Sequence, residues 1–259
     1  MADQDVVIGQ DVVIGADGCP GGWVGTLVPV LRSGADYTAQ FAEAQVRLFK
    51  TFAEIPLSEP HLLCVAVDIP IGLPDRVGTG GRSCDVQARK VLGARQSAIF
   101  SMPSRDAVMC SDYREACDVA LATSDPPRKI SKQAFHLFPK IREVDTLLSP
   151  ELQRRVVECH PEVAFWALNG ETALDTPKKV KSRPNPEGIA FRRQLLESVG
   201  YSTELFEGQP FPRSKVGADD ILDACVNAWS ALRIVRGEAK RFPEHPETDR
   251  LGLRMEIWG

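Results

Sequence analysis

Acidic residues follow apolar runs at four places in this chain of 259 residues. Asp17 ends the run VVIGAD, Asp68 ends LLCVAVD, and Glu158 lies in RVVECHPE. The fourth run, DDILDACVNAW, begins with two acids. A carboxylate is costly to bury unless it is hydrogen-bonded, neutralised or bound to a metal. Acids at the ends of buried strands therefore predict a divalent cation that holds them together.

The fourth group of acids lies at the start of a predicted helix over residues 219–236. Asp220 and Asp223 are three residues apart and Asp219 and Asp223 are four apart, so both pairs are neighbours on a helix surface. Apolar residues recur at 3- and 4-residue spacing along the rest of the helix, and Gly237 provides a stop. The acids lie outside this apolar stripe. Asp219 is a further possible ligand, less favoured than Asp220 and Asp223. The helix macrodipole offers another explanation for acids in a first turn, because it favours negative charge there.

Strand alternation predicts that several of these carboxylates meet at one edge of a sheet. If their strands are parallel neighbours, Asp17 and Asp68 reach the same carboxyl edge, which is where open α/β sheets bind ligands. Neighbouring strands lie about 4.8 Å apart, so two such carboxylates can share one cation. The combination with a helix Asp-x-x-Asp suits two-metal phosphodiester chemistry. The candidate catalytic residues, which are also the candidate ligands of Mg²⁺ or Mn²⁺, are Asp17, Asp68, Glu158, Asp220 and Asp223.

The order of the elements predicts a mixed α/β sheet flanked by helices. The hexapeptide QDVVIG occurs twice, at 4–9 and 10–15, and only the second copy leads directly into Asp17. We take the second copy as the first core strand and the first copy as an edge extension or frayed tail. The further strands are expected at 23–31, 37–48, 61–68 and 154–159. The helices are expected at 50–55, 83–93, 111–122, 131–149 with a kink at Pro139, 161–170, 188–200 and 219–236.

Composition bounds the class of protein. The chain has a net charge of −4, so contacts with phosphodiesters must come from local Lys and Arg clusters or from bound metal. Its seven cysteines are scattered and form no C-x-x-C pair, which argues against a zinc ribbon. No basic signal-peptide region and no apolar run of membrane-spanning length is present, so a cytoplasmic location with no membrane partner is expected.

Several longer motifs resemble one known family. They occur in one order from about Val12 to about Pro243: VDIPIGLP, GGRSCDVQARKVLGARQSAIFSMPSR, ECHPEVAFWALNG, PKK, EGIAFRRQLL and DDILDACVNAWSA. In these motifs the chain resembles the predicted RNase H-like nucleases, domain-of-unknown-function family 429. The stretch from GGR to PSR is the most specific of them.

The resemblance implies a ribonuclease H-like fold with a mixed five-stranded sheet flanked by helices. A single domain over 12–243 would carry a helical insertion at about 70–150 after the fourth strand, with an N-terminal extension at 1–11 and a C-terminal tail at 244–259. The likeness to Holliday-junction resolvases assigns Asp17, Asp220 and Asp223 by position. Resolvases use a Glu within the second acidic strand, whereas this chain has Asp68 at a strand end. The implied activity is a metal-dependent nuclease in which carboxylate-bound Mg²⁺ or Mn²⁺ activates water.

Basic residues provide possible contacts to the phosphates of a nucleic-acid partner. Two groups stand out: arginines in the family-specific stretch and a dense lysine run after it. The candidates for substrate phosphate are Arg82, Arg89, Arg95, Lys178 and Lys179. The alternative for the arginines is ion pairing with Asp85 or Asp106, and the alternative for the lysines is an exposed solvated loop.

Two other functions compete with the nuclease. In the first, the fold is a non-catalytic binding or regulatory module and the acids are structural. In the second, the chain is a nucleotide-binding phosphotransferase of the actin and sugar-kinase type. That architecture needs two halves with a phosphate loop in each, and only one Asp-Gly strand end, at Asp17-Gly18, is present. The type of nucleic acid and the oligomeric state are not determined by the sequence.

Overall fold

The computed structural model describes residues 10–181 and 183–259, so the first QDVVIG copy at 4–9 lies outside the described residues. The chain divides into two compact units. The first unit consists of Met1–Asp68 and Lys178–Ala239, and the second of Ile69–Pro177 and Lys240–Gly259. The boundary at Ile69 coincides with the predicted start of the insertion, but the second unit extends beyond residue 150 and includes the C-terminal segment.

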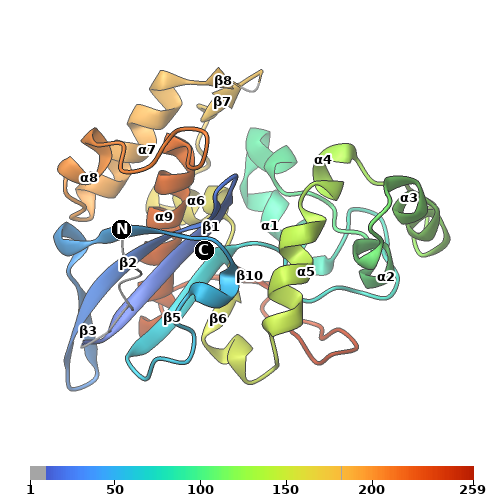
Figure 1. Ribbon diagram of the computed structural model, residues 1–259, viewed down its shortest axis with the longest axis horizontal. Helices are drawn as coiled ribbons and strands as arrows, with labels where there is room; N and C mark the ends of the chain where they lie inside the picture. The colour runs from blue at the N-terminus through green and yellow to red at the C-terminus, as the bar shows by residue number, and fades with distance from the viewer. Residues whose placement is uncertain (1–9, 182) are drawn as a thin grey trace. The chain divides into compact units, whose positions relative to one another are not determined.

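The first unit is built on a mixed sheet, as predicted from the α/β pattern, and it contributes five strands to it. Its order is β3-β2-β1-β5, and β4 also pairs with β2 (Figure 1). β2 is antiparallel to β1, β3 and β4, whereas β5 is parallel to β1. The strands are β1 (Val12–Cys19), β2 (Gly22–Ser33), β3 (Asp36–Ala39), β4 (Gln45–Phe49) and β5 (Leu62–Asp68).

The region predicted as one strand over 37–48 forms two strands, β3 and β4. A 3-10 turn at Phe41–Glu43 separates them, and the two strands pair with successive stretches of the long strand β2. The turn places the Phe41 ring 4.7 Å from the ring of Tyr201. Because of this split the helical insertion follows the fifth strand and not the fourth. The predicted strand at 154–159 is the short strand β6 (Val156–Glu158) of the second unit.

The long helix α9 (Ala218–Arg236) packs on the central strands β1 and β5 of the first unit. Gly15 in β1 makes this close approach possible, because a Cβ there would lie 2.0 Å from the Ala224 carbonyl oxygen of α9. Gly237 ends the helix in the left-handed conformation at φ 72°, as predicted. Helix α7 (Pro186–Ser198) packs against α9, and α8 (Glu204–Glu207) follows it. The hairpin of β7 (Lys179–Val180) and β8 (Arg183–Pro184) precedes α7.

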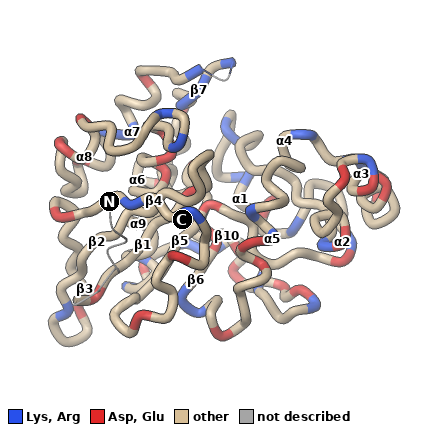
Figure 2. Tube along the Cα trace, viewed as in Figure 1, with Lys and Arg blue, Asp and Glu red and all other residues tan. Residues whose placement is uncertain are grey.

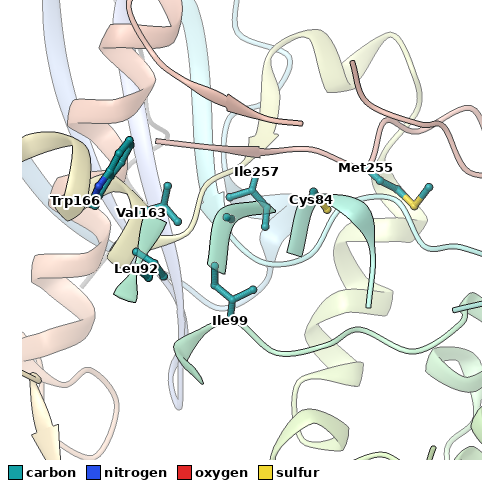
Figure 3. Close-up of a cluster of buried hydrophobic side chains, with 8 residues drawn as sticks. Cys84, Leu92, Ile99, Val163, Trp166, Met255 and Ile257 are labelled. Atoms are coloured by element: carbon teal, nitrogen blue, oxygen red, sulfur yellow. The ribbon is translucent and has the colours of Figure 1, made fainter. Parts of the chain in front are cut away.

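The second unit has its own hydrophobic core. Figure 3 shows part of it, where Leu92 lies directly after α1, α6 contributes Val163 and Trp166, and the C-terminal segment contributes Met255 and Ile257. The segment predicted as a tail at 244–259 is therefore part of this core. The elements are α1 (Ser83–Val91), α2 (Arg105–Met109), α3 (Tyr113–Ala122), α4 (Lys132–Phe135), α5 (Phe138–Leu147), α6 (Pro161–Leu168), β9 (Arg241–Phe242) and β10 (Ile257–Trp258).

Several helices differ from the prediction: the helix expected over 50–55 is a 3-10 turn at Phe52–Glu54, and α2 was not expected. The predicted kinked helix over 131–149 is divided into α4 and α5, and Pro139 lies in the first turn of α5, where a missing N–H breaks no helix hydrogen bond. Arg82 is the N-cap residue of α1, and its N–H donates to the Asp85 carboxylate at 3.0 Å. None of the helices formed by the described residues is long and apolar enough to cross a membrane.

Candidate functional site

Strands β1 and β5 place two aspartates beside each other. Asp17 and Asp68 are direct partners in the parallel register, at the carboxyl ends of both strands. Residues that share a register position in neighbouring strands lie about 5 Å apart. Asp17 is only 7% exposed. The expected adjacency of the two strand-end carboxylates is confirmed. Because Asp17 is buried, water screens the repulsion between the two charges only weakly.

Helix α9 adds further carboxylates to this edge of the sheet. Asp219 and Asp223 are buried in its first two turns, and the charge of Asp223 acts directly on Asp17. Asp220 has a structural task, because its Oδ2 accepts the N–H of Gly217 at 2.8 Å and so caps the helix. The other oxygen of Asp220 takes no part in this cap. Four of the five predicted ligands thus come from one unit of the chain.

The carboxylate cluster is short of positive charge. Burial raises the pKa of Asp17 well above its ordinary range, and the neighbouring charges of Asp223 and Asp68 raise it further. Burial likewise raises the pKa of Asp223 to about 7, with Asp68 adding to the effect and Lys178 opposing it. Burial also raises the pKa of Asp220, although the bond from Gly217 opposes the shift. Such a cluster gains free energy by taking up a proton or a cation.

Two lysines supply part of that charge. Lys178 Nζ donates to Asp223 Oδ2, and Lys179 Nζ lies 2.6 Å from Asp219 Oδ2. Burial opposes the charge on Lys178, but Asp223 and Asp17 together raise its pKa above the ordinary value. Both residues lie where the chain enters the β7 hairpin, whose Lys and Arg positions are blue in Figure 2. The lysine run, for which phosphate contact and an exposed solvated loop were the alternative predictions, therefore directs two ammonium groups onto the acids.

The donor set agrees with a hard divalent cation, although the observed arrangement is not that of a bound ion. All of the converging groups are carboxylates, which Mg²⁺ and Mn²⁺ prefer. Asp223 Oδ1 is buried with no hydrogen-bond partner, and the Lys178 ammonium group stands where a positive charge is needed. Across residues 10–181 and 183–259, no three His, Cys, Asp or Glu side chains are grouped closely enough to hold a metal. Metal binding thus requires the carboxylates to move closer together.

Glu158, the fifth predicted ligand, belongs to the second unit and has other partners. Its two oxygens accept Arg82 Nη2 at 2.6 Å and Nη1 at 2.8 Å, and Oε2 also accepts the Ile71 N–H at 2.7 Å. Burial raises the pKa of Glu158 to about 7 against the opposing effect of Arg82. Arg82 bonds Asp85 as well, at 2.7 Å. These contacts form a buried ion-pair network, and the roles of Glu158 as a ligand and Arg82 as a phosphate contact stay predictions.

The other two arginines are also engaged within the second unit. Arg89 donates to the carbonyl oxygens of Ile99 and Gly80 and to the Ser101 hydroxyl. Arg95 pairs with Glu162 at 3.3 Å. Ion pairing was the alternative expected for this group, and for Arg82 it occurs in the interior and not on a solvated surface. A contact of Arg89 or Arg95 with substrate phosphate stays a prediction.

Sequence reasoning missed two residues that position the site. Gly15 allows α9 to lie against β1, and Asn227 donates from Nδ2 to the Ala16 carbonyl oxygen at 3.2 Å, which fixes the helix beside Asp17. A signal for Gly15 was present, since it shares a strand face with Asp17. A signal for Asn227 was also present, since it follows Asp223 by four residues and therefore lies on the same face of the helix.

Comparison with known proteins identifies a family and no function. The family model described as "Protein of unknown function (DUF429)" matches residues 15–248. No curated protein and no solved structure matches the chain.

Proposed function

The chain belongs to the DUF429 family of proteins of unknown function, and we propose that it is a metal-dependent phosphodiester hydrolase, a nuclease on a ribonuclease H-like fold. One observation carries this proposal: Asp17 and Asp68 are paired at a strand edge and share their electrostatic environment with the buried Asp223 of α9. Asp17 and Asp223 are buried and Asp68 is half-buried, and such interacting carboxylates destabilise a fold unless they are hydrogen-bonded, neutralised or bound to a metal.

The proposed ligands are four carboxylates of the first unit: Asp17, Asp68, Asp220 and Asp223. Mg²⁺ or Mn²⁺ held there would lower the pKa of an attacking water and stabilise the leaving oxygen. The chain's own contribution is to bring these side chains to one edge of the sheet, since β1, β5 and α9 pack directly on one another. Asp223 has the free oxygen, because only its Oδ2 is bound to Lys178.

The two lysines would change partners in this mechanism. A divalent cation bound to Asp223 would take the place of Lys178 there, and its charge would weaken the attraction between Lys179 and the neighbouring Asp219, which frees both ammonium groups. These groups would then contact the phosphate of a nucleic-acid strand as point charges. The nucleic acid is thus expected to be bound through its backbone, and this kind of binding weakens as salt is added.

Cleavage assays on aspartate variants test the proposal. A panel of single- and double-stranded DNA, RNA and an RNA–DNA hybrid would be incubated with Mn²⁺ and the wild-type protein. Asp17→Asn and Asp223→Asn keep the side-chain size and remove ligand charge, so both should abolish the cleavage. Asp36→Asn is the matched control, because Asp36 is an exposed residue of β3 in the same unit. Cleavage by Asp17→Asn at the wild-type rate would overturn the proposal.

A non-catalytic binding module is the second candidate, and a specific observation favours it. Lys178 and Lys179 already pair with Asp223 and Asp219, so the acids have counter-charges without any metal. Thermal denaturation separates the two candidates. A metal site should raise the melting temperature as Mn²⁺ is added, because the ion binds the folded state. If the carboxylates are structural and are neutralised by Lys178 and Lys179, the melting temperature should not rise.

A further inference from the structure

The second unit contains a cavity, and none of the proposed carboxylate ligands lines it. Its volume is about 220 Å³. An apolar cavity of about 150 Å³ is enough to hold benzene, so this cavity has room for a small molecule with one substituted ring. Three chain segments contribute to its lining: the first through Val77, Gly78, Gly80 and Gly81, the second through Phe100–Ser104, and the third through Ser124 and Arg128–Ser131, together with Ala120 and Ala134.

Hydrogen bonds hold the walls in place without any ligand. Val77 N–H donates to the Thr123 carbonyl and the Asp125 N–H donates to the Val77 carbonyl, both at 2.9 Å, which joins the first wall to the third. Ser101 Oγ donates to the Gly80 carbonyl at 3.0 Å, which joins the first wall to the second. A cavity whose walls are already ordered loses little entropy when it binds a ligand.

The lining combines buried apolar side chains and four serines with two exposed cations at the surface. Met102, Ile130 and Ala134 are buried in the interior. Arg128 and Lys129 are exposed, and their side chains make no hydrogen bond or ion pair within the described part of the chain. No Asp or Glu of the described residues lines the cavity. An unneutralised pair of cations beside an apolar interior selects for an organic anion.

We propose that this cavity binds a small phosphomonoester whose organic part is a single ring or a branched chain of similar size. The apolar part lies against Met102 and Ile130, and the phosphate meets Arg128 and Lys129. A dianionic phosphate matches two adjacent cations, and the arginine can bind it through two parallel N–H groups. This proposal is independent of the carboxylate cluster and of its metal.

Calorimetry with three small probes tests the proposal on the full-length protein. Phenyl phosphate carries both the ring and the anion, phenol carries the ring alone, and inorganic phosphate carries the anion alone. Phenyl phosphate should bind at least about tenfold more tightly than either fragment, since it makes both sets of contacts. The double variant Arg128→Gln/Lys129→Gln should weaken its binding by about tenfold or more, because charge-assisted hydrogen bonds are lost.

The control variant is Lys90→Gln/Arg154→Gln, which removes two exposed cations of the same unit that do not line the cavity. It has the same net charge as the test variant and should bind phenyl phosphate like the wild type. Equal affinity for phenyl phosphate and inorganic phosphate would overturn the proposal. An equal loss of affinity in both double variants, or undetectable binding of phenyl phosphate to the wild type, would do the same.

Discussion

At the scale of single residues, Lys178 and a divalent cation compete for the same carboxylate. The ammonium group is bonded to Asp223, and Asp17 adds to the attraction. Lys178→Gln should therefore raise the affinity for Mn²⁺, measured by calorimetry. In the absence of metal the same variant should lose about 1–3 kcal/mol of unfolding free energy, because it leaves a buried acceptor without its partner.

The control for this experiment is Lys181→Gln, which removes an exposed charge of the same hairpin. It should leave both quantities close to the wild-type values. Unchanged or weaker Mn²⁺ binding by Lys178→Gln would contradict the competition.

The raised pKa of Asp223 gives the metal-free protein a defined dependence on pH. The folded state holds a proton up to about pH 7, whereas the unfolded chain releases it near the ordinary pKa of 3.8. Between these values the folded state binds more protons, so its unfolding free energy falls as the pH rises. Urea unfolding at several pH values from about 4 to about 8 measures the slope. Asp223→Asn should flatten it, and an equal slope in that variant would contradict the assignment.

The aspartates could be predicted from the sequence, whereas their lysine partners could not. Asp17 and Asp68 each end an apolar run, and alternation together with parallel pairing then fixes their adjacency. Lys178 lies in a stretch without periodicity, 45 residues from Asp223 in sequence. A charge in such a stretch gives no local signal of the direction in which it points, and only tertiary structure brings it to the acids.

At the scale of elements, the contact between β1 and α9 positions the site. A Cβ on Gly15 would lie 2.0 Å from the Ala224 carbonyl and 2.1 Å from the Ala228 N. Gly15→Ala therefore has to push the helix away from the strand, which should cost about 1–3 kcal/mol or more. Chemical denaturation measures this loss, and Mn²⁺ binding should weaken along with it because Asp223 moves away from Asp17.

Gly208→Ala is the matched control for this substitution, because a Cβ added at Gly208 would meet nothing within 4 Å and the φ of this residue is not left-handed. The variant should unfold like the wild type. If Gly15→Ala retained both the wild-type stability and the wild-type Mn²⁺ affinity, the close packing would not be what positions the carboxylates.

Elements with strong periodicity and clear stops were predictable. Helix α9 has an apolar stripe and a terminal Gly237, and the strand ending at Asp68 is a continuous apolar run. The division of residues 37–48 into two strands was not predictable. Both strands pair with the long strand β2, and the turn between them packs against the ring of Tyr201, which is distant in sequence. Local sequence contains neither piece of information.

At the scale of the whole molecule, each of the two units has its own core. The sequence motifs run continuously through both units, so the division could not be read from them. The C-terminal segment carries few long apolar runs, yet Leu253, Met255 and Ile257 are buried in the second unit. Their contribution depends on a return of the chain over a long sequence separation, which leaves no local pattern.

This division predicts that a core defect in the second unit acts locally. Ile257 is 1% exposed, and Ile257→Ala should cost about 2–5 kcal/mol through the cavity that it leaves. Hydrogen exchange should then show faster opening of α1 and α6, while the amides of β1 and α9 keep their protection. Leu251→Ala, at a side chain that is 49% exposed, should change neither region. If β1 and α9 lost protection to the same extent as α1 and α6, the two units would unfold as one cooperative structure, and the cavity and the carboxylate cluster would share a single stability.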